Sequence, residues 1–340
     1  MIELKFPRFF ACPAHQKSPR LRRRRYTNRL LGALIVLFVP CTFFAQNRPR
    51  IVMVTHGQAG DPFWAVVRTG AEAGSRETES NLEYQSPPHF DLVAMSHLID
   101  VATASKPDAL IVSIPDVAIL GQSIKAAVAA GIPVISINSG LAASKRLGCL
   151  MHIGQEDEEA GRKAGQRMKA AGVRDALVLN QEVGNVGLDL RIRGFKQGFE
   201  GPFHHVQVLP VTIDPQQSKV AITDYLQTHS GEDGIVGLGP TVAEPALEVV
   251  ERLGKVGRIK VCSFDTSPAI LEALANHRLE FSVDQQQWLQ GYLPVVFLGN
   301  YVRYGAIVQN DLILTGPSFI TPDNVQKVMT LLNGAAHPAQ

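Results

Sequence analysis

Cysteine is scarce in this sequence, with four cysteines in 340 residues. Only Cys149 and Cys262 follow residue 45, and each stands in an apolar, strand-like run. Two cysteines cannot form the several bridges of a disulfide-stapled domain, and no Cys/His spacing is typical of a metal site. We therefore expect two buried free thiols, no disulfide framework and no bound metal.

The motifs of common enzymes are absent as well. The turn Gly57–Gly60 does not match GxGxxG, and the sequence contains no GxxxxGK[ST] phosphate loop. His56 offers a candidate base, but no Ser or Cys nucleophile stands in an elbow motif. The acidic run Glu156–Glu159 is typical of a charged helix start, and His152 is interpreted as a core histidine whose ring nitrogens are both satisfied by hydrogen bonds. We expect no catalytic residue, no cofactor and no enzymatic activity.

No apolar run is long enough to span a bilayer comfortably. Leu30–Val39 gives ten residues without a charge, directly after a basic cluster. This length and order are typical of a secretory signal peptide. We expect residues 1–45 to comprise a signal peptide and a preceding basic segment, which directs the chain to the periplasm. Two variants stay open, a twin-arginine signal at Arg24-Arg25-Tyr26 and a lipidation site at Cys41.

The net charge of +2 conceals two unequal parts of the chain. Nine basic residues and one acidic residue lie before residue 46, so the remaining 24 basic and 30 acidic residues carry about −6. Because the excess of positive charge belongs to the predicted export segment, it does not indicate nucleic-acid binding. We expect no nucleic-acid partner.

The stretch Arg50–Trp64 organises the rest of the chain. Ile51–Val54 is an apolar run typical of a strand buried on both faces, and a turn of small residues follows it. Asp61 can then cap a helix, with Pro62 in its first turn. Open α/β sheets bind ligands at this end of a parallel strand, so the two aromatic residues that follow are candidates for a ligand site.

Strand-like and helical patterns alternate after Arg50, and the same order restarts after Gly154. Repeated βα units predict doubly wound parallel sheets, and 340 residues favour two domains. We expect an α/β fold of two similar doubly wound lobes joined by a multi-strand hinge. The predicted first lobe comprises residues 50–153 plus 286–315, and the second comprises residues 154–285 plus 316–335.

Polar residues gather at the predicted strand ends, where both lobes would face a crevice. Each has an ordinary structural explanation, such as a helix cap, a turn residue or a surface cation. Together they supply the carboxylates, amides and guanidinium that a hydroxyl-rich ligand needs beside flat aromatic faces. The predicted ligand-binding residues are Asp61, Phe63, Trp64, Asn138, Ser139, Asn185, Arg191, Thr241, Asp265 and Gln285.

Five segments of this sequence resemble the type I periplasmic sugar-binding proteins, the ribose/galactose group of ABC transporter substrate-binding proteins. They are IVMVTHGQAGDPFW, AAGIPVISINSG, LDLRIRGFKQGF, VCSFDTSP and VDQQQWLQGY, which occur in the family's order and spacing. The resemblance covers residues 50–333. Single motifs are shared with LacI-type repressors, but a signal peptide stands where those need a helix-turn-helix.

The resemblance implies roles for individual residues. Asp61 would touch the sugar, and Phe63 and Trp64 would sandwich its ring. Arg191 and Asp265 match the family's arginine and strand-end acid, and Gln285 matches its hinge-side glutamine. Two departures, Asn138-Ser139 for an Asp-Arg pair and Gly239-Pro240 for Asn-Asp, imply a ligand unlike ribose or galactose.

The implied function is capture of a sugar or sugar-like polyol by a monomer, with delivery to an inner-membrane ABC permease driven by a separate ATPase. Closure of the two lobes by hinge bending would favour the docking-competent form. A periplasmic receptor for a signalling molecule such as autoinducer-2 stays open, because Gly239-Pro240-Thr241 resembles a loop of those relatives. An exported α/β enzyme is a further alternative. The sequence names neither the sugar nor a chemoreceptor partner.

Overall fold

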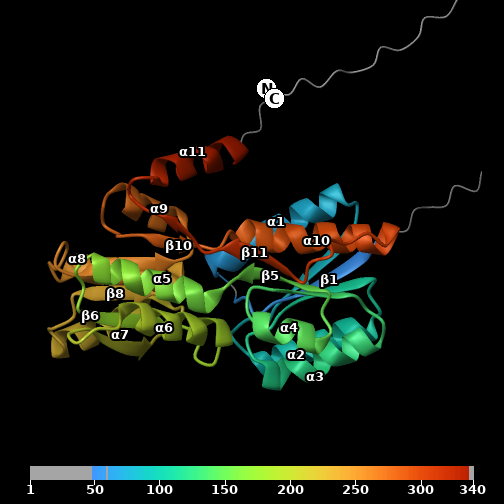
Figure 1. The fold of residues 1–340 in the computed structure, drawn as a ribbon, viewed down its shortest axis with the longest axis horizontal. Helices are drawn as coiled ribbons and strands as arrows, with labels where there is room; N and C mark the ends of the chain where they lie inside the picture. The colour runs from blue at the N-terminus through green and yellow to red at the C-terminus, as the bar shows by residue number, and fades with distance from the viewer. Residues whose placement is uncertain (1–47, 59, 337–340) are drawn as a thin grey trace, which may run out of the picture. The chain divides into compact units, whose positions relative to one another are not determined.

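The computed structural model of the protein describes residues 48–58 and 60–336, so the predicted signal peptide lies outside the described residues. Within these ranges the strands form two six-stranded sheets (Figure 1). We call each sheet, with the helices packed on it, a lobe. No helix among the described residues is both long and apolar enough to cross a membrane.

The first sheet has the strand order β2-β1-β3-β4-β5-β11, with all neighbours parallel. Its strands are β1 (Arg50–Val54), β2 (Asn81–Gln85), β3 (Ala109–Ser113), β4 (Val134–Ile137), β5 (Met151–Gln155) and β11 (Leu312–Gly316). The first strand lies inside the sheet and the chain winds outward in both directions. This is the doubly wound arrangement that the alternating pattern predicts.

The second sheet repeats this order as β7-β6-β8-β9-β10-β12, and β12 alone among these strands runs antiparallel to its neighbour. Its strands are β6 (Asp175–Asn180), β7 (His205–Pro210), β8 (Gly234–Gly237), β9 (Lys260–Phe264), β10 (Ser282–Asp284) and β12 (Ser318–Ile320). The predicted α/β class with two similar lobes is confirmed.

Helices cover both sheets. Those of the first lobe are α1 (Pro62–Glu77), α2 (Leu92–Ala104), α3 (Val117–Ala129), α4 (Leu141–Leu147) and α10 (Gln287–Tyr304). Those of the second lobe are α5 (Asp157–Ala170), α6 (Val186–Phe199), α7 (Pro215–Thr228), α8 (Pro240–Arg252), α9 (Pro268–Ala275) and α11 (Val325–Ala336). The expected cap of α1 is present, since Asp61 Oδ1 accepts the backbone N–H of Phe63 at 2.9 Å.

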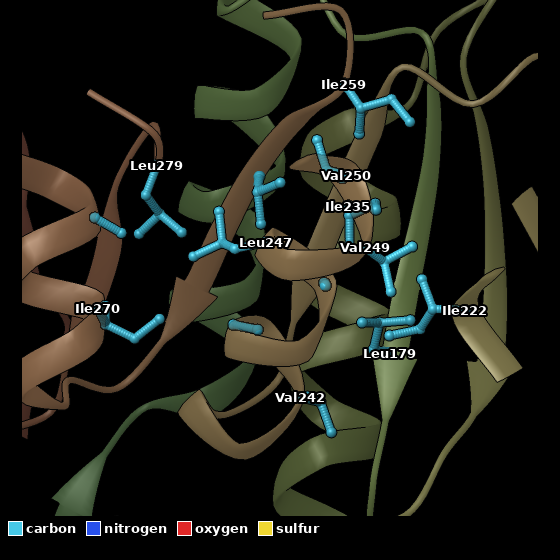
Figure 2. Close-up of a cluster of buried hydrophobic side chains, with 14 of the residues drawn as sticks. Leu179, Ile222, Ile235, Val242, Leu247, Val249, Val250, Ile259, Ile270 and Leu279 are labelled. Atoms are coloured by element: carbon cyan, nitrogen blue, oxygen red, sulfur yellow. The ribbon is translucent and has the colours of Figure 1, made fainter. Parts of the chain in front are cut away.

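The cores form on both faces of each sheet. Along β1, Ile51 and Met53 pack into one cluster and Val52 and Val54 into another, because successive side chains of a strand point to opposite faces. In the second lobe a cluster of aliphatic side chains fills the space between the sheet and α7, α8 and α9 (Figure 2). Runs buried on both faces explain why these strands read as continuous apolar segments.

Two helices belong to a different lobe from the strand that precedes them in the chain. The helix α5 follows β5 of the first sheet but packs on α6, and α10 follows β10 of the second sheet but packs on α1 (Figure 1). The chain therefore passes between the lobes near Gln155–Asp157, near Asp284–Gln287 and near Gly316–Ser318. Three connections form the multi-strand hinge, while the exact domain boundaries stay a prediction.

In both helix pairs, α1 with α10 and α5 with α6, the backbones approach closely at a glycine. A Cβ atom on Gly291 of α10 would lie 1.8 Å from the carbonyl oxygen of Val67, and one on Gly194 of α6 would lie 1.9 Å from that of Glu158. A hydrogen in place of a methyl group is what allows these backbones to approach. Close packing on α10 and on α5 therefore positions α1 and α6, the helices that carry Phe63, Trp64 and Arg191.

The structure agrees with some local predictions and differs from others. Cys149 and Cys262 are buried free thiols, as expected. The sequence patterns did not predict α4, β12 or α11. His152 lies in the core, but only its Nδ1 meets a partner, the Ser136 hydroxyl, while its Nε2 is buried without one among the described residues. The prediction of a fully hydrogen-bonded histidine was therefore wrong, and burial lowers its pKa to about 4, which keeps the ring neutral.

Candidate functional site

A cavity with an empty volume of about 410 Å³, including space open to solvent, lies between residues of the two lobes. All ten residues that the sequence singled out line it: Asp61, Phe63, Trp64, Asn138, Ser139, Asn185, Arg191, Thr241, Asp265 and Gln285. They come together because the carboxyl ends of the strands in both sheets face one crevice. Sequence reasoning missed other lining residues, above all His56, Gln181 and Glu182.

The aromatic wall of the cavity comes from the start of α1. Phe63 and Trp64 are each 6% exposed, and their rings meet edge to face, with centroids 5.0 Å apart and planes at 80°. Two rings at this angle cannot both lie parallel to one flat guest, so the sandwich implied by the resemblance is not the observed arrangement. A ligand ring can stack on one of them, and Gly57 leaves the space in which the Trp64 indole lies.

His56 anchors the turn before this wall. Asn185 Oδ1 accepts the backbone N–H of Gly187, so its Nδ2 faces His56 Nε2 at 3.2 Å and donates to it. The proton of the imidazole then lies on Nδ1, which meets the Ser113 hydroxyl at 2.7 Å. Burial, with a smaller effect from the charge of Arg191, lowers the pKa of His56 to about 3, so the ring is neutral.

The second lobe contributes a buried guanidinium. Arg191 on α6 donates from Nε to Asp157 Oδ1 at 2.8 Å and from Nη1 to the carbonyl of Leu238 at 3.3 Å. Nη1 also lies 3.6 Å from Asp265 Oδ2, and the guanidinium stacks over the Phe264 ring at 5.0 Å. Burial disfavours the charge, but the attraction of Asp157 and Asp265 outweighs it and raises the pKa of Arg191.

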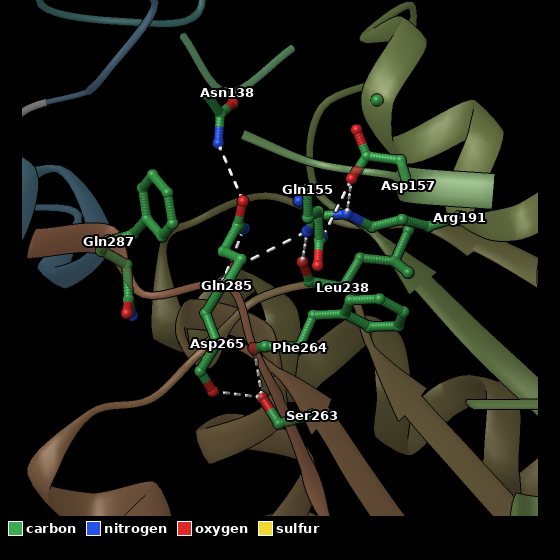
Figure 3. A network of polar contacts seen from close by, with 12 residues as sticks. Asn138, Gln155, Asp157, Arg191, Leu238, Ser263, Phe264, Asp265, Gln285 and Gln287 are labelled. Atoms are coloured by element: carbon green, nitrogen blue, oxygen red, sulfur yellow. Dashed lines mark hydrogen bonds and ion pairs between the residues drawn. The ribbon is translucent and has the colours of Figure 1, made fainter. Parts of the chain in front are cut away.

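Gln285 links the two lobes through its amide, as Figure 3 shows. Its Oε1 accepts from Asn138 Nδ2 at 3.3 Å, and its Nε2 donates to Asp265 Oδ1 at 2.8 Å. Asn138 follows β4 and Asp265 follows β9, the corresponding strands of the two sheets, and both have left-handed backbone conformations with φ of 61° and 62°. Strained non-glycine residues of this kind concentrate at functional sites. Ser267, and not Asp265, caps α9.

The lobes also touch each other directly at the cavity. Gln58 Nε2 of the first lobe donates to Glu182 Oε1 of the second at 3.1 Å, and Ser139 Oγ donates to Asn185 Oδ1 at 3.1 Å. The backbone N–H of Val186 donates to the carbonyl of Pro115 at 2.8 Å. The structure is therefore a closed form, in which residues of both lobes surround the cavity.

Some polar groups in the cavity wall retain unused capacity. Gln181 Oε1 is buried without a hydrogen-bond partner among the described residues, and Asp61 uses Oδ1 for the cap of α1. Burial and then the nearby Glu182 raise the pKa of Asp61 to about 7, and burial raises that of Asp265 to about 7 against the pull of Arg191. The described residues contain no group of three His, Cys, Asp or Glu side chains arranged to hold a metal.

Two doubly wound lobes, connected by three crossing segments and closed on a polar cavity with an aromatic wall, define the class of two-lobed solute-binding proteins. A family model described as a periplasmic binding protein domain matches residues 51–306, and the chain belongs to this family.

Solved structures and relatives of known class support this family assignment. A carbohydrate transporter from Acidothermus cellulolyticus 11B, in complex with myo-inositol, is 32% identical, covers 84% of this chain and 98% of its own, and has a TM-score of 0.79. An ABC sugar transporter component from Legionella pneumophila is 26% identical over 79% of this chain and all of its own, with a TM-score of 0.74. The xylose/arabinose-binding protein XylF of Sulfolobus acidocaldarius is 25% identical over 82% of this chain and 72% of the relative.

Proposed function

We propose that the chain is the periplasmic substrate-binding protein of an ABC importer, which captures a sugar or sugar-like polyol in the interlobe cavity. The observation that carries this proposal is the cavity itself, where residues from both lobes combine an aromatic face with carboxylates, amides and a buried guanidinium. Aromatic faces contact the C–H side of a sugar ring, while polar groups bind its hydroxyls. The similarity to sugar-binding proteins supports the same conclusion.

The cavity favours binding over chemistry. Its histidine is neutral and engaged with Ser113 and Asn185, and its arginine is held by Asp157. No lining Ser or Cys stands beside His56 as a nucleophile at the cavity surface, since Ser113 is fully buried. These features support a binding protein rather than an enzyme.

Closure would report capture to the membrane. A ligand held by Trp64 of the first lobe and Arg191 of the second stabilises the closed form, and this shift in population is what a permease can recognise. The exported monomer would then deliver its ligand to an inner-membrane permease with its ATPase. The predicted lobes, residues 50–153 plus 286–315 and 154–285 plus 316–335, would move as rigid bodies about the three crossings.

A thermal-shift panel tests the proposal. The protein without the predicted signal peptide, residues 46–340, is heated with D-ribose, D-xylose, L-arabinose, D-allose, D-galactose, myo-inositol and autoinducer-2, each at millimolar concentration. A ligand at one hundred times its Kd adds about 2.7 kcal/mol to the free energy of unfolding. A shift with one sugar or polyol supports import, and a shift with autoinducer-2 alone assigns the signalling receptor instead. If no compound raises Tm and calorimetry detects no binding, the sugar-binding proposal is wrong.

A further inference from the structure

The charges that line the cavity are unequal. Asp61, Glu182 and Asp265 contribute three carboxyl groups, whereas Arg191 is the one Lys or Arg among the described lining residues. His56 adds no positive charge, because it is buried and neutral. A wall of this composition is rich in acceptors and poor in cations.

Arg191 already forms an ion pair with a carboxylate that does not line the cavity. It lies 2.8 Å from Asp157, and the side chains of both residues are 6% exposed. Asp265 is farther away, at 3.6 Å from Nη1. The guanidinium therefore pairs with Asp157 and, at a longer distance, with Asp265, whereas Asp61 and Glu182 form no ion pair with a Lys or Arg among the described residues.

Closure brings these carboxyls together from different lobes. Asp61 belongs to the first lobe and Glu182 to the second, and Glu182 is 5% exposed in the closed form. Glu182 accepts hydrogen bonds from neutral amides only, Gln58 Nε2 at 3.1 Å and Asn185 Nδ2 at 2.7 Å. Burial and the proximity of Glu182 raise the pKa of Asp61. Bringing together two carboxyls that form no ion pair with a Lys or Arg of the described chain opposes closure of the empty protein.

A ligand that completes this wall supplies what the wall lacks. A hydroxyl group donates one hydrogen bond and brings no charge, whereas an ammonium group donates three and brings a positive charge. Hydrogen bonds between charged partners are about twice as strong as neutral ones. On the premise of the proposed function, we propose that the cavity takes an amino sugar or aminocyclitol, whose ammonium group lies beside Asp61 and Glu182 while its hydroxyls face Arg191 and the amides.

Calorimetry with matched compounds tests this ligand class, at a pH below the pKa of each amine. The pairs are D-glucose with D-glucosamine, and myo-inositol with an aminodeoxyinositol. N-acetyl-D-glucosamine keeps the nitrogen but removes its charge. We expect at least one amine to bind at least about tenfold more tightly than its neutral parent, and the N-acetyl compound to lose this advantage.

Variants locate the effect in the wall. Glu182→Gln and Asp61→Asn each remove one carboxylate, and asparagine at position 61 still caps α1. Either change should reduce the amine-to-parent preference by about tenfold. The matched control is Asp189→Asn, which removes an exposed carboxylate from α6 that does not line the cavity, and it should leave the preference unchanged.

The outcomes separate the two proposals. Equal or tighter binding of the neutral parents overturns the amine ligand but leaves sugar capture standing. Absence of binding by every sugar, polyol and amine overturns both. If Glu182→Gln does not fold, the Asp61→Asn variant and the wild-type pairs still decide the question, since an amine preference that survives Asp61→Asn contradicts the proposed position of the ammonium group.

Discussion

The two lobes use one order of strands and helices but line different halves of the cavity. The turn after β1 leads to Phe63 and Trp64, whereas the corresponding turn after β6 leads to Glu182 and Asn185. The first lobe thus supplies the flat apolar surface, and the second supplies Arg191 and most of the charge. A repeated scaffold places residues at equivalent positions without fixing their chemistry.

One pair of equivalent positions makes this clearest. Asn138 after β4 and Asp265 after β9 have the same left-handed conformation, and both bond to Gln285. One carries a neutral amide and the other a carboxylate beside Arg191. The two lobes have the same backbone conformation at this position. The side chain determines whether the position accepts or donates a hydrogen bond.

The largest expected effect concerns the buried charge of the second lobe. Arg191→Met leaves Asp157 buried without its partner, which should lower the free energy of unfolding by about 3–5 kcal/mol. The matched control is Arg193→Met on the same helix, whose pair with Glu158 is solvent-exposed, so this change should lower the free energy of unfolding far less. Urea denaturation measures both. Equal losses would mean that Arg191 carries no special structural role.

The next effect tests whether the lobes are equivalent in their helix packing. Gly291→Ala in the first lobe and Gly194→Ala in the second place a methyl group within 1.9 Å of a backbone oxygen, and each should cost about 1–3 kcal/mol. Gly121→Ala on α3 is the control, because its nearest neighbour is 3.4 Å away and the change should stabilise by about 0.4–1 kcal/mol. If denaturation shows that only one lobe suffers, the two helix pairs are not equivalent.

Much of this arrangement could be predicted from sequence for a physical reason. Parallel strands are buried on both faces and read as apolar runs, and the residues that follow them share one edge of the sheet. That rule found Asn138, Arg191 and Asp265 without any knowledge of how the lobes meet. Asp61 and Pro62 likewise predicted the start of α1, because they form a local capping pattern.

Contacts that depend on docking of separate segments were not predictable. Asp157 stands in an acidic run that reads as a helix start, and only the packing of α5 on α6 brings it to Arg191. Glu182 and His56 meet because the lobes close, and no spacing in the chain encodes their proximity. The angle between the Phe63 and Trp64 rings is also a property of packing, which the sequence does not encode and which differs from the implied sandwich.

A smaller effect distinguishes the aromatic wall of the first lobe from its surface. Trp64→Leu keeps apolar bulk but removes the flat ring, and should weaken ligand binding by about 1–3 kcal/mol. Trp288→Leu is the control, because Trp288 is 39% exposed and does not line the cavity. Calorimetry with the ligand found in the panel measures both variants. Unchanged affinity in a folded Trp64→Leu variant would remove this ring from the site.

The smallest effect is a pH dependence that connects the lobes. The pKa of Asp61 is raised from 3.8 to about 7 in the folded chain, so the folded state binds more protons than the unfolded state between these values. The stabilising contribution of this group is therefore complete below about pH 4 and is lost as the pH rises to about 7. Asp61→Asn does not titrate, so its stability relative to wild type should increase across this window in urea denaturation without ligand.

Glu182→Gln shows whether that dependence comes from the other lobe. Glu182 raises the pKa of Asp61 second only to burial, so removing its charge should narrow the pH window over which Asp61→Asn gains stability. An unchanged window in the Glu182→Gln background assigns the shift to burial within the first lobe alone. A stability difference that does not vary with pH would mean that the Asp61 carboxyl is solvated, and that the lobes do not oppose each other with charge when the cavity is empty.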